Sequence, residues 1–212
     1  MKDIVIVGGP GFGEEIVWLL ERINKLKKQF NILGFINKDI PKGQFIGKYK
    51  VLGNDDFLND IPEGTSVCIA IGNSKARKKI AEKIENLNLE YPSLIDPTAQ
   101  ISETVTIGKG CIICSNTVFT TNIQINDFSI INLSCTVGHG CKINRFSTVL
   151  PGCNISGEVE LDEACSIGTG AQIIPGCHIG CNSIIGAGAV VINDIVENST
   201  AVGIPAKVIN KC

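Results

Sequence analysis

Residues 129–149, SIINLSCTVGHGCKINRFSTV, carry a large aliphatic side chain at every sixth position. The repeat passes through Ile131, Val137, Ile143 and Val149. Continued in both directions, the same step covers residues 95–191 without a break, and all 17 positions are apolar. Because apolar residues make up near half of ordinary composition, chance gives such a run with a probability on the order of 10⁻⁵. The period predicts a solenoid built from identical short units.

Small side chains stand two positions before most of these aliphatic residues, and six of the ten cysteines fall there. Short strands joined by tight corners every six residues form a triangular coil of about 18 residues, with successive coils roughly 4.8 Å apart. The six cysteines are spaced by 6, 12 and 24 residues, which does not match the ligand spacing of zinc sites. Free cysteine is a good small apolar filler, so we expect these thiols to be structural.

Residues 1–94 follow a different pattern. The segments DIVIVGG, NILGFIN and TSVCIAIG read as strands, and FGEEIVWLLERINKLKK has apolar residues at helical spacing. The segment SKARKKIAEKIENLN reads as a second helix, capped by Ser74. Strands alternating with helices predict a small parallel α/β unit. We therefore expect two domains, residues 1–94 and 95–212.

Composition excludes several classes of protein. The net charge is -2, and no segment concentrates basic residues as a nucleic-acid binder would. No apolar run reaches the 18 residues of a membrane span, and the N-terminal apolar patch is shorter than the core of a signal peptide. We expect a cytoplasmic protein that neither binds nucleic acid nor inserts into a membrane.

The repeat resembles the left-handed parallel β-helix of hexapeptide-repeat acyltransferases. A small α/β domain, then the β-helix, then VGIPAK at residues 202–207 is similar to the sialic-acid O-acetyltransferase and nucleotide-sugar N-acetyltransferase family. This resemblance implies an α/β N-terminal domain with a short parallel sheet, followed by a left-handed parallel β-helix. It also implies acetyl-CoA as co-substrate without a metal, a nucleotide-sugar substrate from bacterial surface-glycan or glycoprotein sugar biosynthesis, and a homotrimer.

His139, one of two histidines, follows the buried position Val137 by two residues. Its side chain should therefore leave the coil near a corner, stacked between Thr121 and Gly157, where the glycine leaves room for a ligand. From the residues alone His139 is either an ordinary surface histidine or a base active at neutral pH. The resemblance implies the second role, with His139 and Gly157 catalytic: the imidazole as general base, the Gly157 N–H at the developing oxyanion.

Several relatives carry an acidic residue directly after the catalytic histidine, where this chain has Gly140. A carboxylate at that place would orient the ring and raise its basicity. We therefore expect either a carboxylate from another part of the chain or of a neighbouring subunit, or a weaker base. His178 falls in another register, and we expect it to be a surface residue.

The loop GGPGFGEE resembles a dinucleotide fingerprint but has Glu14 at the third glycine position. It can hold a phosphate at the helix N-terminus or simply form a tight turn. The family resemblance implies substrate binding by Gly11, Phe12, Gly13, Asn37, Lys38, Gly72 and Asn73, where Phe12 and Asn37 depart from the usual His and Asp. It implies cofactor binding by Thr148, Gly157, Thr169, Ala187, Gly203 and Lys207.

Our leading hypothesis is acetyl transfer to the amino group of a nucleotide-linked aminosugar. A sugar O-acetyltransferase is the nearest alternative, because the same base deprotonates a hydroxyl. The zinc carbonic anhydrases that resemble this fold hold their metal with three histidines. This alternative is excluded because the chain has two histidines. A non-catalytic binding or scaffold protein is the third alternative, and it predicts that replacing His139 changes nothing measurable.

Overall fold

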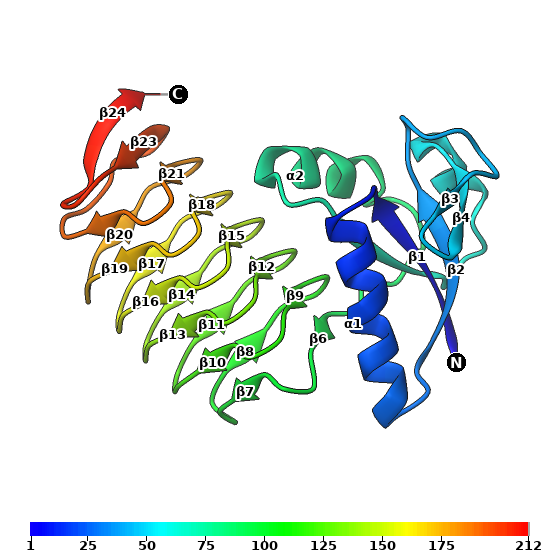
Figure 1. Ribbon diagram of the computed structural model, residues 1–212, viewed down its shortest axis with the longest axis horizontal. Helices are drawn as coiled ribbons and strands as arrows, with labels where there is room; N and C mark the ends of the chain where they lie inside the picture. Colours follow the sequence, from blue (N-terminus) through cyan, green and yellow to red (C-terminus); the bar gives the residue numbers. More distant parts are fainter. Residues whose placement is uncertain (212) are drawn as a thin grey trace.

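The computed structural model describes residues 1–211, which form an α/β unit and a β-helix (Figure 1). The α/β unit contains one five-stranded sheet in the order β3-β4-β2-β1-β5. Its elements are β1 (Lys2–Gly8), α1 (Phe12–Leu26), β2 (Phe30–Ile36), β3 (Phe45–Ile46), β4 (Tyr49–Gly53), the 3₁₀ helix η1 (Asp55–Asp60), β5 (Ser66–Ala70) and α2 (Ser74–Lys83).

Strand β1 lies between β2 and β5 in this sheet and is parallel to both. Its side chains alternate between two apolar clusters, as the period of a strand requires. Ile4 and Ile6 pack with the buried stripe of α1, whereas Val5 and Val7 pack with residues of η1 and α2. The chain crosses to β2 on one side of β1 and to β5 on the other, so the topological switch point lies between β1 and β5.

The β-helix has three faces of parallel two-residue strands. The first face holds β7 (Gln100–Ile101), β10 (Val118–Phe119), β13 (Thr136–Val137), β16 (Asn154–Ile155), β19 (Gln172–Ile173) and β22 (Val190–Val191). The second holds β8 (Thr106–Ile107), β11 (Gln124–Ile125), β14 (Lys142–Ile143), β17 (Glu160–Leu161) and β20 (His178–Ile179). The third holds β6 (Leu94–Ile95), β9 (Ile112–Ile113), β12 (Ile130–Ile131), β15 (Thr148–Val149), β18 (Ser166–Ile167), β21 (Ile184–Ile185), β23 (Ser199–Val202) and β24 (Lys207–Lys211).

The register of the strands repeats every 18 residues, as in the pairing of Thr136 with Val118 and with Asn154. The second residue of each two-residue strand from β7 to β22 points inward, and together these residues form one continuous apolar core. The fold class predicted from the six-residue period is confirmed. Strand β24 alone departs from the parallel arrangement, because it folds back antiparallel to β23.

The corner thiols hydrogen-bond to the next coil. The Cys135 and Cys153 thiols donate to the carbonyls of Leu150 and Gly168, each 15 residues on in the chain. The hydroxyl of Ser147 makes the same contact with Asp162. Burial raises the pKa of Cys111, another member of this register, to about 11, so its thiol keeps its proton at neutral pH. The described corner cysteines are free, as expected for structural thiols.

The α/β unit packs on the third face of the β-helix (Figure 1). Outward side chains on this face are apolar in the first coils, and Ile112 and Ile130 are buried against the cluster that contains α1. Asp96 accepts two hydrogen bonds from Arg22 of α1, at 2.7 and 3.0 Å. Lys78 of α2 forms an ion pair with Glu163.

Two local expectations are corrected, and one hairpin was not foreseen. The hairpin of β3 and β4 has no strong alternation in the sequence and was not predicted. Helix α2 ends at Lys83 rather than continuing to residue 88. Its N-cap is Asn73, whose side chain accepts from the Ala76 N–H, because Ser74 turns its hydroxyl toward the β-helix. No helix in residues 1–211 is long and apolar enough to cross a membrane.

Candidate active site

His139 lies on the corner between the first and second faces, in the turn that joins β13 to β14. The side chain is exposed, and its ring lies against Gly157, the equivalent corner residue of the next coil. A Cβ added at Gly157 would stand 2.6 Å from Nε2 and 2.7 Å from Cε1 of this imidazole. The glycine therefore makes room for the ring itself, rather than for a ligand beside it as we expected.

Backbone groups at this corner are arranged around the same two residues. The His139 carbonyl accepts from the Glu158 N–H at 2.7 Å, which fixes the two coils together. Within residues 1–211, no acceptor pairs with the Gly157 N–H. The same range contains no hydrogen-bond partner for the His139 ring. Both groups are therefore available to other molecules.

Glu158 stands above Gly140 on the neighbouring coil. Its Cγ lies 3.3 Å from the position that a Cβ of residue 140 would take. Gly140 adopts a φ of 69°, in the left-handed region where glycine is favoured. The side chain of an acidic residue thus packs beside the residue after His139, although it comes from 18 residues further along the chain.

The residues predicted to bind the cofactor lie in three separate places. Gly157 shares the corner of His139, but Thr169, Ala187 and Gly203 follow β18, β21 and β23 on the corner between the third and first faces. Lys207 begins β24 and is exposed. One face of six residues separates the two corners, which is about 20 Å of extended chain.

Thr148, which was predicted to contact the cofactor, is covered by the α/β unit of its own chain. Thr148 is 2% exposed and lies on the third face beneath α2. Its hydroxyl donates to the Gly72 carbonyl at 3.0 Å and accepts from Arg77 Nη2 at 2.8 Å. The side chain points outward from the coil as the register requires, but the α/β unit covers it.

Arg77 connects the α/β unit to the β-helix and is 1% exposed. Its guanidinium donates to the carbonyls of Phe128 at 2.8 Å and Phe146 at 2.6 Å, both on the corner between the second and third faces. It also donates to the carbonyl of Ile71 at 2.6 Å, at the end of β5. Burial lowers the pKa of Arg77 to about 9. This side chain fixes the loop after β5 against the solenoid.

A cavity of about 410 Å³ opens at the carboxyl edge of the sheet, and we call it the α2 cavity. The ends of β1, β2 and β5 line it with Gly8, Gly9, Ile36 and Ala70, and one face of α2 closes it. Four charged residues line it as well: Lys38, Asp39, Asp55 and Lys79. Open α/β sheets bind their ligands at such a crevice beside the switch point.

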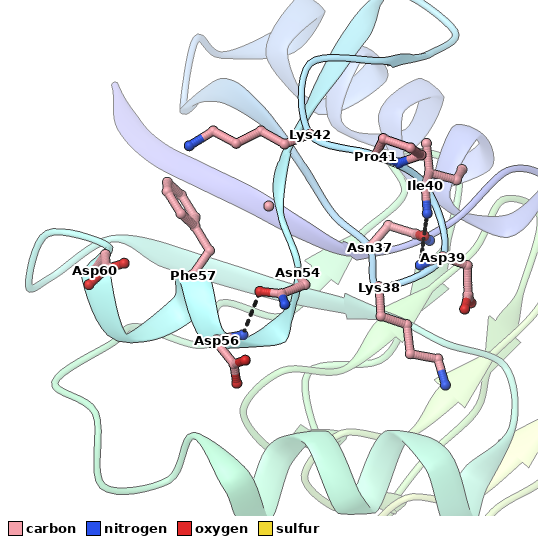
Figure 2. Close-up of a pocket in the computed structure, with 11 residues that line it drawn as sticks. Asn37, Lys38, Asp39, Ile40, Pro41, Lys42, Asn54, Asp56, Phe57 and Asp60 are labelled. Atoms are coloured by element: carbon pink, nitrogen blue, oxygen red, sulfur yellow. Dashed lines mark hydrogen bonds between the residues drawn. The ribbon is translucent and has the colours of Figure 1, made fainter.

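A second cavity of about 470 Å³ adjoins the first, and we call it the loop cavity (Figure 2). Asn37, Lys38 and Asp39 line both cavities. The Lys42 ammonium group lies over the Phe57 ring, 5.1 Å from the ring centre, and both residues line the loop cavity. The Asn37 side chain closes the turn after β2, donating to the Gly8 carbonyl and accepting from the Asp39 and Ile40 N–H groups.

Of the predicted substrate residues, Asn37 and Lys38 lie in these cavities, and the others do not line them. Gly13 packs against the Phe35 ring, which a Cβ would meet at 2.9 Å. Gly11, Phe12, Gly72 and Asn73 lie at the ends of the two loops that flank the crevice. The glycine loop contributes Gly8 and Gly9 to the α2 cavity instead.

Three residues at this crevice were not predicted from the sequence. Lys79 and Asp55 line the α2 cavity, and Arg77 holds the loop beside it. The signal for Arg77 and Lys79 was the run RKK, in a segment that was predicted only to form a helix. Ile112 and Ile130 are aliphatic at outward positions and are buried by the α/β unit, but Ile184 is also aliphatic and outward and yet exposed, so this pattern alone does not locate the covered face.

His178 is an exposed residue on β20, as expected, and its Nε2 lies 2.9 Å from an Asp162 carboxylate oxygen. Among the described residues no group of three His, Cys, Asp or Glu side chains is placed to hold a metal ion.

Comparisons with known proteins agree along the whole chain. A family model described as the PglD N-terminal domain matches residues 3–84. The chain is 28% identical over 198 residues to the GDP-perosamine N-acetyltransferase of Escherichia coli O157:H7, covering 93% of this chain and 81% of that protein.

Two solved structures extend this likeness to three dimensions. PerB from Caulobacter crescentus, in complex with CoA and GDP-perosamine, superposes with a TM-score of 0.90 at 27% identity, covering 99% of this chain and 98% of PerB. The acetyltransferase domain of PglB from Neisseria gonorrhoeae FA1090, in complex with acetyl coenzyme A, gives 0.88 at 30% identity, covering 98% and 99%.

The fold and these matches define an acetyltransferase of the left-handed β-helix class. Within that class, the chain belongs to the nucleotide-sugar N-acetyltransferase family.

Proposed function

We propose that this enzyme transfers an acetyl group from acetyl-CoA to the amino group of a nucleotide-linked aminosugar, with His139 as general base. The observation that carries the proposal is the exposed imidazole lying on Gly157 at an open corner of the β-helix. The relatives that act on GDP-perosamine support an amine as acceptor. Surface-glycan or glycoprotein sugar biosynthesis is the pathway we assign to it.

In this mechanism the sugar nitrogen attacks the thioester carbonyl, so a C–N bond forms and the C–S bond breaks. His139 takes the proton that the nitrogen loses, and CoA leaves as a thiol after protonation of its sulfur. An imidazole serves both directions of proton transfer near neutral pH. The unpaired Gly157 N–H supports a role in stabilising the carbonyl oxygen, where charge develops.

Glu158 is our candidate for the carboxylate that relatives place directly after the histidine. Its side chain packs beside Gly140, and its N–H is bonded to the His139 carbonyl. A carboxylate turned toward the ring would stabilise the positive charge that the imidazole gains during transfer. Glu158 would then act through His139 as a positioning residue rather than as a catalytic one.

The acceptor must reach His139 from another copy of the chain. The α/β unit covers the third face, whereas His139 lies on the opposite corner, between the first and second faces. One chain therefore holds its own crevice and its own base on different sides of the solenoid. This separation supports a homotrimer in which neighbouring copies complete each site, since threefold contacts join two different patches.

Acetyl-CoA would run between neighbouring β-helices in this assembly. Ile174 and Ile192 are exposed above Gly157 on the corner of His139. Ile204 is exposed beside Gly203 on the other corner, above Thr169 and Ala187. Apolar side chains on both corners support contacts with the pantetheine chain and with the neighbouring copy.

The test is acetyl-CoA consumption, followed chromatographically, with GDP-perosamine and a panel of UDP- and GDP-linked amino and hydroxy sugars. We expect turnover on an aminosugar and its loss in His139→Ala, with the oligomer retained by gel filtration. Turnover only on hydroxy sugars would replace this function by O-acetylation. Full activity of His139→Ala would remove the proposed base, and no turnover on any sugar would favour a scaffold protein.

A further inference from the structure

The four lysines of α2 divide into two kinds. Lys78 pairs with Glu163 of the β-helix, and Lys83 pairs with Asp56 at 2.9 Å. Lys75 and Lys79 are exposed and have no acidic partner within residues 1–211. Of these two, Lys79 lines the α2 cavity and Lys75 does not. The helix therefore presents one uncommitted cation to the crevice.

Lys38 approaches the same cavity from the loop after β2. In Figure 2 its side chain extends away from the loop cavity, in the direction of α2. It lines the α2 cavity together with Lys79 and is likewise without an acidic partner in the described chain. Two ammonium groups on one small cavity match an anion of more than one charge.

The usual place for a phosphate in such a fold is already taken. In a dinucleotide fingerprint the phosphate binds at the N-terminus of the first helix. Here the Glu14 carboxylate accepts from the Gly11 N–H at 3.1 Å and occupies that end of α1, with Glu15 beside it. A second anion at this helix end would meet like charge, so a phosphate needs another site.

The remaining charges of the cavity indicate its orientation. In parallel α/β folds the acidic side chain beyond the second strand accepts from ribose hydroxyls. Asp39 stands at this place, and Asp55 lines the same cavity. Carboxylates suit the hydroxyl donors of a nucleoside and repel its phosphates. The phosphates are then left to the side of the cavity where Lys79 projects from α2.

We propose that Lys79, together with Lys38, binds the diphosphate of the nucleotide-sugar in the α2 cavity. This inference rests on the proposed function, because it assigns the charged part of that same substrate. It names a residue that acts in binding rather than in proton transfer, and it places the diphosphate on α2 instead of on the glycine loop.

The experiment measures binding of GDP and UDP, and of guanosine and uridine, by calorimetry in the absence of acetyl-CoA. Lys79→Ala is compared with Lys75→Ala, which removes another exposed and unpaired lysine from the same helix. Loss of one charge-assisted contact weakens diphosphate binding about 10- to 100-fold. We expect this loss in Lys79→Ala, with nucleoside binding unchanged and Lys75→Ala equal to the wild type.

Equal diphosphate affinities of Lys79→Ala and Lys75→Ala would overturn the assignment, and wild-type turnover on nucleotide-sugars would leave the proposed function intact. A wild-type protein that binds nucleosides as tightly as diphosphates would also overturn it. If the wild type binds neither diphosphate and acetylates only free aminosugars, both the assignment and the proposed substrate class fail. In turnover assays Lys79→Ala should raise KM for the nucleotide-sugar and leave kcat unchanged.

Discussion

Replacing Gly157 by alanine tests the corner chemistry without removing any catalytic group. The new Cβ would stand 2.6 Å from Nε2 and 3.0 Å from Cδ2 of His139, against an ordinary contact of roughly 3.5 Å. The imidazole must therefore move by about 1 Å. A displacement of that size costs about 100-fold in rate when it misplaces a catalytic group. We expect Gly157→Ala to lower kcat about 100-fold.

Stability should change little in the same variant, because the obstructing atoms belong to a side chain that can rotate into solvent. We expect the free energy of unfolding to stay within about 1 kcal/mol of the wild type. Gly180→Ala is the matched control, since its Cβ would stand 2.5 Å from the backbone nitrogen of Glu197, which cannot move freely. That variant should lose about 1–3 kcal/mol or more.

Steady-state acetyl transfer and urea denaturation of the three proteins supply the comparison. Adding Gly157→Ala to His139→Ala should cause no further loss of kcat, because both act through one imidazole. A Gly157→Ala enzyme with wild-type kcat would refute the assigned position of the ring. A loss of stability equal to that of Gly180→Ala would refute the distinction between a mobile ring and a fixed backbone.

Two further outcomes follow from the charged groups. Burial raises the pKa of Asp96, but hydrogen bonds from Arg22 and Thr98 outweigh it, so the pKa lies below its ordinary 3.8. Asp96→Asn should therefore lower the free energy of unfolding by about 1.5–3 kcal/mol at pH 7, and the difference from the wild type should vanish as the pH falls below 3.8 in acid titrations of stability. Glu158→Gln should lower kcat about tenfold, whereas Glu160→Gln on β17 should leave kcat unchanged.

Much of the fold was predictable from the sequence because every coil of a solenoid repeats the same local pattern. The aliphatic residues at every sixth position point inward, as Val137 and Ile143 illustrate, and small or turn-forming residues lie at the corners. The α/β elements were also readable, since β1 and α1 carry the periods of their types. Short elements without a pattern, such as the β3–β4 hairpin, were not, because their pairing depends on neighbours.

Only part of the candidate site was predictable from the sequence. The position of His139 on an exposed corner was predictable, because register alone decides on which side of the coil a side chain stands. The burial of Thr148 was not predictable, because its outward position in the register gives no information about the unit that covers it. Likewise, Lys75 and Lys79 are two lysines of the same helix, and only the tertiary packing shows that Lys79 lines the α2 cavity and Lys75 does not.

The sequence by itself determined the period, the coil, and which side chains face in or out, since these depend on contacts between residues close in the chain or one turn apart. The tertiary structure decided which face the α/β unit covers, and therefore that His139 and the crevice lie on different sides of one chain. That outcome depends on long-range contacts such as the buried hydrogen bonds of Arg77, which join residues 51 and 69 positions apart. Such contacts cannot be predicted from the periodicity of the sequence.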